Sequence, residues 1–461
     1  MASKHRRSSK SAPATTAGHE PISPEEVSRL RRTNVGLYHV IPAGPVARDL
    51  LKAGLEAEVV WLGELPGHVA RLKELFAGHD AFDVLAAIWQ ALSVNDDLPV
   101  AERDPFLDSV TPLEYAALVL VERPSRAPAS SSPLLDLRAT IKEVIPHLRA
   151  LTSMAATALS RRWYRPADDA LVAIQERFVV RYICVPINET DQQASAWLLE
   201  SFEDPAIERW MRAELGFGIE QANRLITAII QVAAFQPVSS TSSPIGIGEQ
   251  AAFSPATIAS RAGVQERVAW SFCDLLAMRF GEPLREWPRL PTQIRHRPLL
   301  ADGVGRYFAP VPPMVRRGLR HTLAAALNPA LNTMGPGHGP TYQRYLDRRA
   351  SLLESWGLLP LRPLLRPDYD VANLHFKVRA TDGKYLEGEI DGLVMVDHKV
   401  IVVQAKSAPT RIDAVASDPS KFASALRAIV TESMRQHDDA RAALLAPRDS
   451  VTFWLRQGGE G

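Results

Sequence analysis

The sequence predicts an α+β protein of several domains, with a mostly helical N-terminal region followed by a C-terminal α/β domain. The chain has 461 residues, which is enough for about three domains. Apolar residues recur at three-to-four spacing through most of residues 23–330, a pattern typical of helices. Residues 385–405 are instead dense in Val, Ile and Tyr around a short polar turn, which predicts a β-hairpin.

Residues 1–22 form a basic segment that we expect to be a disordered tail. No apolar stretch follows its basic residues, so it lacks the pattern of a secretory signal. Nowhere does the chain approach the roughly 18 consecutive apolar residues of a membrane span. The two cysteines, Cys184 and Cys273, lack zinc-type spacing and fit a reducing compartment. These features predict a cytoplasmic protein with no membrane contact.

Two Pro- and Ser-rich stretches, residues 123–133 and 236–244, divide the N-terminal region, and we expect them to be loops or linkers. The helices that the apolar spacing predicts around them are Pro45–Ala53, Pro66–Phe76, Ala81–Leu92, Leu134–Leu159, Ala167–Val180, Ala194–Glu200 and Pro205–Phe235. Because the chain contains 35 Pro residues, an irregular helical array is favoured over a regular bundle.

Residues 254–278 match the pattern of a helix-turn-helix, with Gly263 at the turn. The residues expected to bury its two helices are Ile258, Ala259, Val268, Phe272 and Leu275. Such a motif can lay its second helix in the major groove of DNA. That helix begins with one acidic and one basic residue, Glu266 and Arg267, so plain packing of two helices stands beside DNA reading as an interpretation.

The C-terminal hairpin consists of two predicted strands, Tyr385–Val396 and Lys399–Ala405. The two-residue turn between them fixes the register of the pair. Counting back from the turn places Asp391 directly opposite Gln404. Directly opposed residues of an antiparallel pair project to the same side, with Cβ atoms roughly 4.5–5.5 Å apart. One face of a mostly apolar hairpin therefore carries a carboxylate and an amide oxygen side by side.

The same register places Glu389 opposite Lys406, so an ammonium group lies beside these oxygens. A hard cation such as Mg2+ or Mn2+ keeps several waters, so one carboxylate and one or two carbonyl oxygens suffice to hold it. Asp391, Gln404 and the backbone carbonyl of Ala405 can supply them. A bound metal would lower the pKa of a water and stabilise charge on a phosphate, and Lys406 can assist. The alternative is a solvated face with a surface ion pair between Glu389 and Lys406.

At Asp391 and the Gln404-Ala405-Lys406 sequence after a short apolar strand, the chain resembles the PD-(D/E)XK nuclease superfamily. The Gln-x-Lys variant is similar to Mrr-like restriction endonucleases, and the Glu-Ile-Asp-Gly sequence that begins at Glu389 resembles nuclease-related (NERD-type) domains. The resemblance covers about the last quarter of the chain, residues 336–461. It implies a restriction-endonuclease-like α/β domain with the order helix, three strands, helix, strand.

The predicted elements around the hairpin follow this order: helix Tyr342–Trp356, strand Asn373–Ala380, the hairpin, helix Pro419–Ala446 and strand Val451–Leu455. The stripe of the second helix is Phe422, Leu426, Ile429, Val430 and Met434. The family usually adds an acidic residue from the first helix, and Glu354 is the best local match. Gly357 and the prolines beyond it should end this helix soon after Glu354. Gln343, about three turns earlier, is the other candidate for the same place.

The resemblance implies a catalytic site of Glu354, Asp391, Gln404 and Lys406, with a Mg2+ or Mn2+ ion held by Asp391, Gln404, Ala405 and Glu354. We therefore expect metal-dependent cleavage of phosphodiester bonds in nucleic acid. DNA is the favoured substrate, and the family suggests a role in restriction or defence. The formal net charge of +1 argues neither for nor against an anionic partner, because a nuclease needs only a local basic surface. A homodimer is one possible assembly.

Two other interpretations remain open. The nuclease fold can be kept as a non-catalytic module in a sensor or scaffold, and the Gln in place of an acidic residue leaves room for this. Alternatively, the chain is a helix-turn-helix DNA-binding regulator with an appended α/β domain. A basic face on the second helix, Val264–Met278, would favour the regulator, whereas an acidic or buried face would argue against it.

Overall fold

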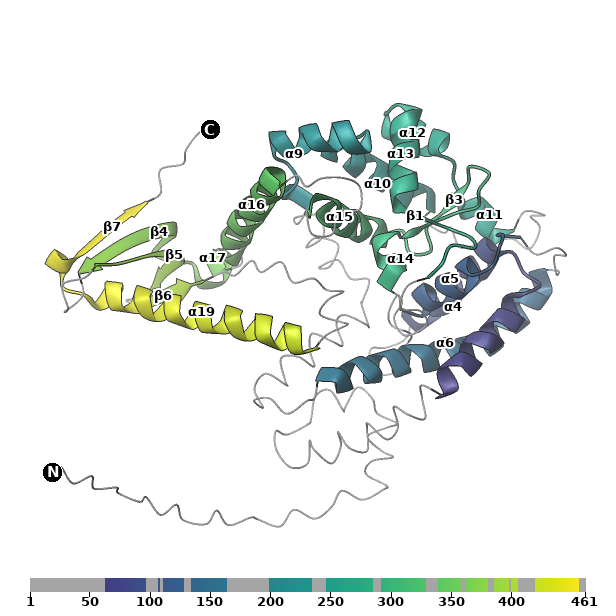
Figure 1. Ribbon diagram of the computed structural model, residues 1–461, viewed down its shortest axis with the longest axis horizontal. Coiled ribbons are helices and arrows are strands. Elements are labelled where there is room, and N and C mark those ends of the chain that lie inside the picture. The colour runs from purple at the N-terminus through teal and green to yellow at the C-terminus, as the bar shows by residue number, and fades with distance from the viewer. Residues whose placement is uncertain are drawn as a thin grey trace, which may run out of the picture.

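The computed structural model shows a protein of mixed α and β structure, as the sequence predicts (Figure 1). The described residues are 63–96, 107, 111–127, 134–163, 199–233, 246–284, 292–328, 339–358, 361–379, 385–397, 399–404 and 419–455. Several sequence predictions lie outside them, namely the tail 1–22, the helices Pro45–Ala53 and Ala167–Val180, and the linker 236–244.

The first apolar core is built by a helix over residues 63–76 together with α4 (Ala81–Asp96), α5 (Thr111–Val121) and α6 (Leu134–Trp163). Every residue of α5 is buried, and its sequence is apolar on all sides, as expected for a helix enclosed by other elements. Its one ionisable carboxylate, Glu114, accepts two hydrogen bonds, of 2.7 and 2.6 Å, from Arg295 of α14 (Thr292–His296). Each of these two side chains is only 4% exposed, so the charges compensate one another inside the core.

Residues 123–133 were expected to form a loop or linker. The described part, residues 123–127, is joined to other segments by the ion pairs of Arg126. Arg126 pairs with Asp80 at 2.9 Å and with Asp302 at 3.4 Å, and it also pairs with Glu249. These three carboxylates come from segments far apart in the sequence. The described part of this stretch therefore packs with the N-terminal helical region, whose described residues between 63 and 328 are called the helical body below. One guanidinium joins three of its segments through charge-assisted hydrogen bonds.

A second apolar core is built by α9 (Pro205–Trp210), the π-helical turn Met211–Leu215, α10 (Ile219–Ala233), α12 (Pro255–Ala262), α13 (Glu266–Leu276) and α15 (Met314–Leu327). The prediction of one continuous helix over Pro205–Phe235 is wrong. The chain is interrupted at Gly216, whose φ of 79° lies in the left-handed region that glycine adopts readily. The interruption allows α10 to turn and pack against α12.

A small sheet of order β1-β2-β3 accompanies this second core. Its strands are β1 (Ala277–Arg279), β2 (Leu299–Ala301) and β3 (Tyr307–Phe308). β1 runs parallel to β2, and β2 runs antiparallel to β3. Phe253, which follows the short α11 (Ile247–Ala251), adds one bridge to Tyr307. The sequence predicted a mostly helical region here, and these three short strands were not predicted.

α16 (Gly339–Leu358) lies between the helical body and the C-terminal sheet and contacts both (Figure 1). Tyr345 in its first half is buried in the second core and stacks on Phe202, with ring centroids 4.7 Å apart. Arg348 donates a hydrogen bond of 2.9 Å to the backbone carbonyl of Glu200. The helix also contacts β4 and β5 of the C-terminal sheet, so it positions that sheet against the body.

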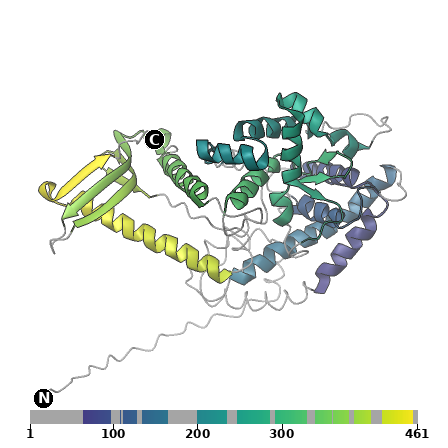
Figure 2. The same ribbon diagram turned by 45° about the horizontal axis from the view of Figure 1, so that its top comes forward.

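The C-terminal sheet has the order β6-β5-β4-β7, and all neighbouring strands are antiparallel. The elements of this part are α17 (Leu361–Leu365), β4 (Tyr369–Arg379), β5 (Tyr385–Val396), β6 (Lys399–Val403), α19 (Pro419–Leu445), the short 3-10 helix Arg448–Ser450 and β7 (Val451–Leu455). Apart from the additional short α17, this order of helices and strands agrees with the sequence prediction. Figure 2 shows the strands side by side, with α19 running away from them along the molecule.

The apolar core of the sheet is small. Its buried members are Phe376, Val378, Ile390, Leu393, Ala440 and Ala443, the last two from α19. Met434 was predicted in the buried stripe of that helix, but it is 63% exposed, so the described packing of α19 uses its C-terminal turns. Among the described residues, no helix combines the length and the hydrophobicity that a membrane span requires.

Candidate functional site on the C-terminal sheet

The hairpin of β5 and β6 has the register that the two-residue turn predicts. Val396 pairs with Lys399, and the ladder continues to Gly392 opposite Val403. The strand ends at Val403, two residues before its predicted end. Gln404 follows directly, so the register brings it opposite Asp391 as predicted. His398, Ala405 and Lys406 lie outside the described residues.

Asp391 is buried, with 7% of its surface exposed. A solvated face was the alternative interpretation here, and the burial of Asp391 argues against it at this residue, whereas the pair of Glu389 with Lys406 involves a residue outside the described part of the chain. Regular alternation of buried and exposed residues ends at this point of β5, because Ile390 through Val394 are all buried. Both α16 and α19 contact β4 and β5, which accounts for the covering of the strand. A carboxylate with this little exposure needs polar partners or a cation.

Asn373 on β4 flanks Asp391 on the other side. The pairing of β4 with β5 keeps one register on both sides of Asn373, which places it opposite Asp391. Its φ of 53° is in the left-handed region, where Asn is among the few tolerated side chains. Its side-chain oxygen is buried and has no hydrogen-bond partner among the described residues. Asp391 therefore lies between two residues that carry amide side chains.

Gln404 is held by one end of its amide. Its Nε2 donates a hydrogen bond of 3.1 Å to the backbone carbonyl of Glu389. Its Oε1 is buried and accepts no hydrogen bond from the described residues. A buried oxygen left in this way costs free energy unless a ligand, water or ion completes it.

His375 and Glu389 form the neighbouring cross-strand pair on β4 and β5. The His375 Nε2 lies 3.4 Å from a Glu389 carboxylate oxygen but is not aligned as a hydrogen bond. On the other side, His375 is paired with Trp454 of β7, and the two rings stack with centroids 5.7 Å apart and an interplanar angle of 17°. Neither Asn373 nor His375 was predicted, because the residues that separate β4 from β5 in the sequence are too many to fix the register of the two strands.

The donor chemistry of this cluster fits a hard divalent cation. Asp391 offers a carboxylate, and Gln404 and Asn373 each offer a buried amide oxygen without a partner among the described residues. Mg2+ and Mn2+ prefer such oxygen ligands. Across the same described residues, no three His, Cys, Asp or Glu side chains gather as a metal site. Amide oxygens would thus have to supply part of the coordination.

The acidic residue expected from the first helix is only partly placed. Glu354 lies in α16, as predicted, and its side chain is outside the described part of the chain. Gln343 is exposed and donates a hydrogen bond of 2.7 Å to Asp347 on the same helix. It lies beside Tyr342, which packs against the second core of the body. Gln343 is therefore directed to solvent on the part of α16 that docks on the body, which does not support its alternative role.

The helix-turn-helix is present as α12 and α13, with Gly263 at the turn and a φ of 63°. The second helix is shorter than the predicted Val264–Met278, because its C-terminal end continues into β1. Its exposed charged residues are Glu266, Arg267 and Asp274. Asp274 also accepts a hydrogen bond of 2.8 Å from the Tyr307 hydroxyl. A face with two carboxylates and one guanidinium is not basic and does not support DNA reading by this helix.

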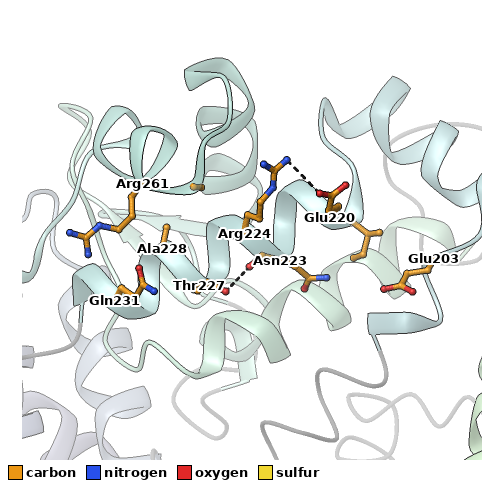
Figure 3. Close-up of a pocket in the computed structure, with 10 residues that line it drawn as sticks. Glu203, Glu220, Asn223, Arg224, Thr227, Ala228, Gln231 and Arg261 are labelled. Carbon is orange, nitrogen blue, oxygen red and sulfur yellow. Dashed lines mark hydrogen bonds and ion pairs between the residues drawn. The ribbon is translucent and has the colours of Figure 1, made fainter.

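A groove of about 520 Å³ lies along α10 and α12 (Figure 3). Some of its polar lining is paired internally, since Arg224 lies 3.9 Å from Glu220 and the Thr227 hydroxyl donates to the Asn223 carbonyl. None of its lining residues has a buried polar atom left without a partner. The sheet therefore offers the stronger candidate site among the described residues.

Comparisons of the chain with protein-family models, with curated proteins and with solved structures find no match.

Proposed function

We propose that the C-terminal domain is a metal-dependent nuclease that hydrolyses phosphodiester bonds in nucleic acid, with DNA as the favoured substrate and restriction or defence as its setting. The observation that supports this proposal best is the position of Asp391. It is a buried carboxylate in the middle of a sheet, flanked on both sides by amide side chains with buried, unpaired oxygens. Such an arrangement is costly for folding alone and suits the binding of a cation.

In the proposed site, Asp391 and Gln404 hold Mg2+ or Mn2+, and the Ala405 carbonyl and Glu354 complete the protein ligands. A metal bound there would supply Lewis acidity toward a phosphate oxygen and lower the pKa of a water. The Nε2 donor of Gln404 is engaged by the Glu389 carbonyl, which orients its Oε1 as the free end. The amide is thereby fixed for coordination before any ligand arrives.

Two further residues are assigned to charge and protons. Lys406 follows Gln404 by two positions and would stabilise charge that develops on the phosphate. His375 beside Glu389 is a group that can accept a proton from an attacking water, because a neutral imidazole has one free nitrogen. Neither role needs a cysteine or serine nucleophile.

The experiment is incubation of the full chain with plasmid DNA and with single-stranded RNA in Mg2+, in Mn2+ and in EDTA. We expect cleavage with either metal and none in EDTA. Lys406→Ala should lose the activity, whereas the matched control Lys399→Ala, an exposed lysine at the start of β6, should retain it. Cleavage that survives EDTA, or that persists in Lys406→Ala at the wild-type rate, would contradict the proposal.

A non-catalytic binding module is the second candidate, and one observation favours it. A metal site commonly has several acidic groups. Among the described residues, Asp391 is instead flanked by two amide side chains, and no three His, Cys, Asp or Glu side chains gather there. Binding of nucleic acid without cleavage in either metal would select this candidate over the enzyme.

A further inference from the structure

Trp454 is an exposed aromatic residue beside the proposed site. It lies on β7, an edge strand of the sheet as described, and is 41% exposed. His375 stacks against it from the neighbouring strand β4. The indole therefore keeps much of its surface in solvent although another ring stacks against it. A large aromatic ring that is both fixed and exposed is a ready surface for stacking a planar ligand.

The ring lies beside residues of the proposed site. Trp454 stacks on His375, and His375 lies against Glu389 at 3.4 Å, so these three side chains project to the same side. Asp391 is two residues beyond Glu389 on the same strand, at the point where the regular alternation of β5 ends, so the ring is connected to it along the chain through Glu389. Because neighbouring strands are about 4.8 Å apart, Trp454 lies roughly 10 Å from the strand that carries Asp391.

The charges on this face do not by themselves favour binding through phosphates. Its described charged side chains are Glu387 and Glu389, against Lys377, Arg379 and His375. Lys377 is already hydrogen-bonded to Glu387, and this bond raises the pKa of Lys377. A nucleic acid bound here would therefore gain its affinity from stacking of bases and from the proposed cation, and less from protein cations.

We propose that Trp454 is a stacking platform for a nucleobase and that the site binds single-stranded nucleic acid more tightly than duplex. This inference rests on the proposed nuclease function and adds a substrate class to it. The bases of a duplex are stacked on one another and offer no free ring face, whereas unpaired bases can stack on an aromatic side chain. Each such stack contributes enough that its loss weakens binding measurably.

The test is equilibrium binding in EDTA, where no cleavage can occur by the proposed route. Fluorescence anisotropy of a labelled oligothymidine, of an oligouridine of the same length and of a matching duplex is measured with the full chain. We expect both single strands to bind more tightly than the duplex. Trp454→Ala should weaken single-strand binding about 10-fold, and Trp454→Phe should keep most of it. Trp270→Ala is the matched control, since Trp270 is 38% exposed on α13, and it should bind like the wild type.

The outcomes separate the two proposals. Single-strand binding that is unchanged in Trp454→Ala overturns the stacking inference even if metal-dependent cleavage is found. A selective loss in Trp454→Ala without any cleavage in Mg2+ or Mn2+ supports the stacking inference and removes the nuclease. Equal loss in Trp270→Ala, or tighter binding of the duplex, overturns the assignment of Trp454. A difference between the two single strands decides between DNA and RNA.

Discussion

The helical body and the C-terminal sheet differ in how their buried polar groups are paired. In the body, the buried charges compensate one another, as in Glu114 with Arg295, and Arg126 satisfies three carboxylates at once. Single atoms such as Gln293 Oε1 are also left without a hydrogen bond there. In the sheet, the unpaired oxygens of Asn373 and Gln404 belong to residues on either side of Asp391. Polar groups that hold a fold are satisfied within it, and polar groups left open together suggest a ligand.

The two regions also differ in how much apolar packing supports them. The body has two large clusters that draw on most of its helices. The sheet has one small cluster, closed mainly by two alanines of α19. A small core contributes less to stability than a large one, because less apolar surface is removed from water. Substitutions in the body should therefore act on stability, and substitutions on the sheet should act first on the chemistry.

The largest effect is expected at Asp391. Asp391→Asn keeps the shape of the side chain but removes the charge that a cation needs, so cleavage of plasmid DNA in Mg2+ should fall at least about 100-fold. The matched control is Asp397→Asn in the exposed turn of the same hairpin, where the φ of 45° suits Asn. Cleavage by Asp391→Asn at the rate of the control would remove the contrast between the two regions.

Asp391→Ala should also cost stability, in contrast to what a solvated face would give. Asp391 is only 7% exposed, so removal of its carboxylate leaves the buried polar groups around it without this partner. The free energy of unfolding should therefore fall by about 1–3 kcal/mol. The asparagine variant separates the loss of chemistry from this loss of stability.

The next effect concerns the buried ion pair of the body. Glu114→Gln leaves the Arg295 guanidinium buried without its counter-charge, so the free energy of unfolding should fall by about 3–5 kcal/mol. Urea unfolding measures it. The matched control is Glu432→Gln on the exposed surface of α19, whose pair with Arg435 should be worth less than about 1 kcal/mol. A similar loss in both variants would show that the body does not depend on its buried pair.

Some of this arrangement follows from the sequence. A two-residue turn has only one register, so Asp391 and Gln404 were placed opposite each other from residue counting alone. The strand that contributes Asn373 and His375 was predicted, but its register was not. Residues 380–384 separate it from the hairpin in the sequence, and a separation of this length is compatible with several registers. These two residues consequently needed the structure.

Two other differences have local causes. The burial of Asp391 was missed because alternation assumes a sheet with one solvated face, whereas β5 is in contact with both α16 and α19. The break at Gly216 was missed because the apolar spacing continues across it. The glycine itself is the signal for a helix end, and its left-handed φ shows that the local signal outweighs the periodic one.

A moderate effect is expected from Gln404→Ala. Removal of the amide oxygen should lower the affinity of the full chain for Mn2+ by about 10-fold or more, which titration calorimetry can measure, and higher Mn2+ should recover part of the cleavage. Gln404→Glu should retain or raise the activity, since it adds a charge for the cation. Gln343→Ala, which removes an exposed amide on α16, should change neither quantity. Equal Mn2+ affinity in Gln404→Ala and the wild type would exclude this residue as a ligand.

A smaller effect is expected from pH in the helical body. His321 is half-buried in α15, and desolvation by burial, with Arg320 and His296 nearby, lowers its pKa well below 6.5. Arg320 donates a hydrogen bond of 2.9 Å to its Nε2, which requires the neutral imidazole. The unfolded chain takes up a proton near pH 6.5 and the folded chain does not. The stability is therefore complete above that pH and falls below it, by up to about 1.4 kcal/mol per pH unit.

The prediction for His321 is tested by urea unfolding at about pH 7.5 and at about pH 5.5, which lie on either side of the ordinary histidine pKa. His321→Gln keeps an acceptor for Arg320 but cannot titrate, so it should flatten the pH dependence relative to the wild type. His437→Gln, an exposed histidine of α19, should leave it unchanged. Other groups such as Asp83, whose pKa burial raises, titrate in both proteins and cancel in the difference. A wild-type slope in His321→Gln would contradict the assignment.

The smallest effects on the free energy of unfolding are expected at two glycines of the helical body, where the backbone conformation decides the sign. Gly263 has a φ of 63° at the turn between α12 and α13, so Gly263→Ala should lower the free energy of unfolding by about 1 kcal/mol. Gly67 is exposed within the helix over residues 63–76, and a Cβ there would meet no atom within 4 Å. Gly67→Ala should therefore raise the same free energy by about 0.5–1 kcal/mol, because alanine loses less backbone entropy on folding. Neither variant should alter cleavage, because both residues belong to the region without the proposed chemistry. Changes of the same sign in the two variants, measured by urea unfolding, would contradict this account.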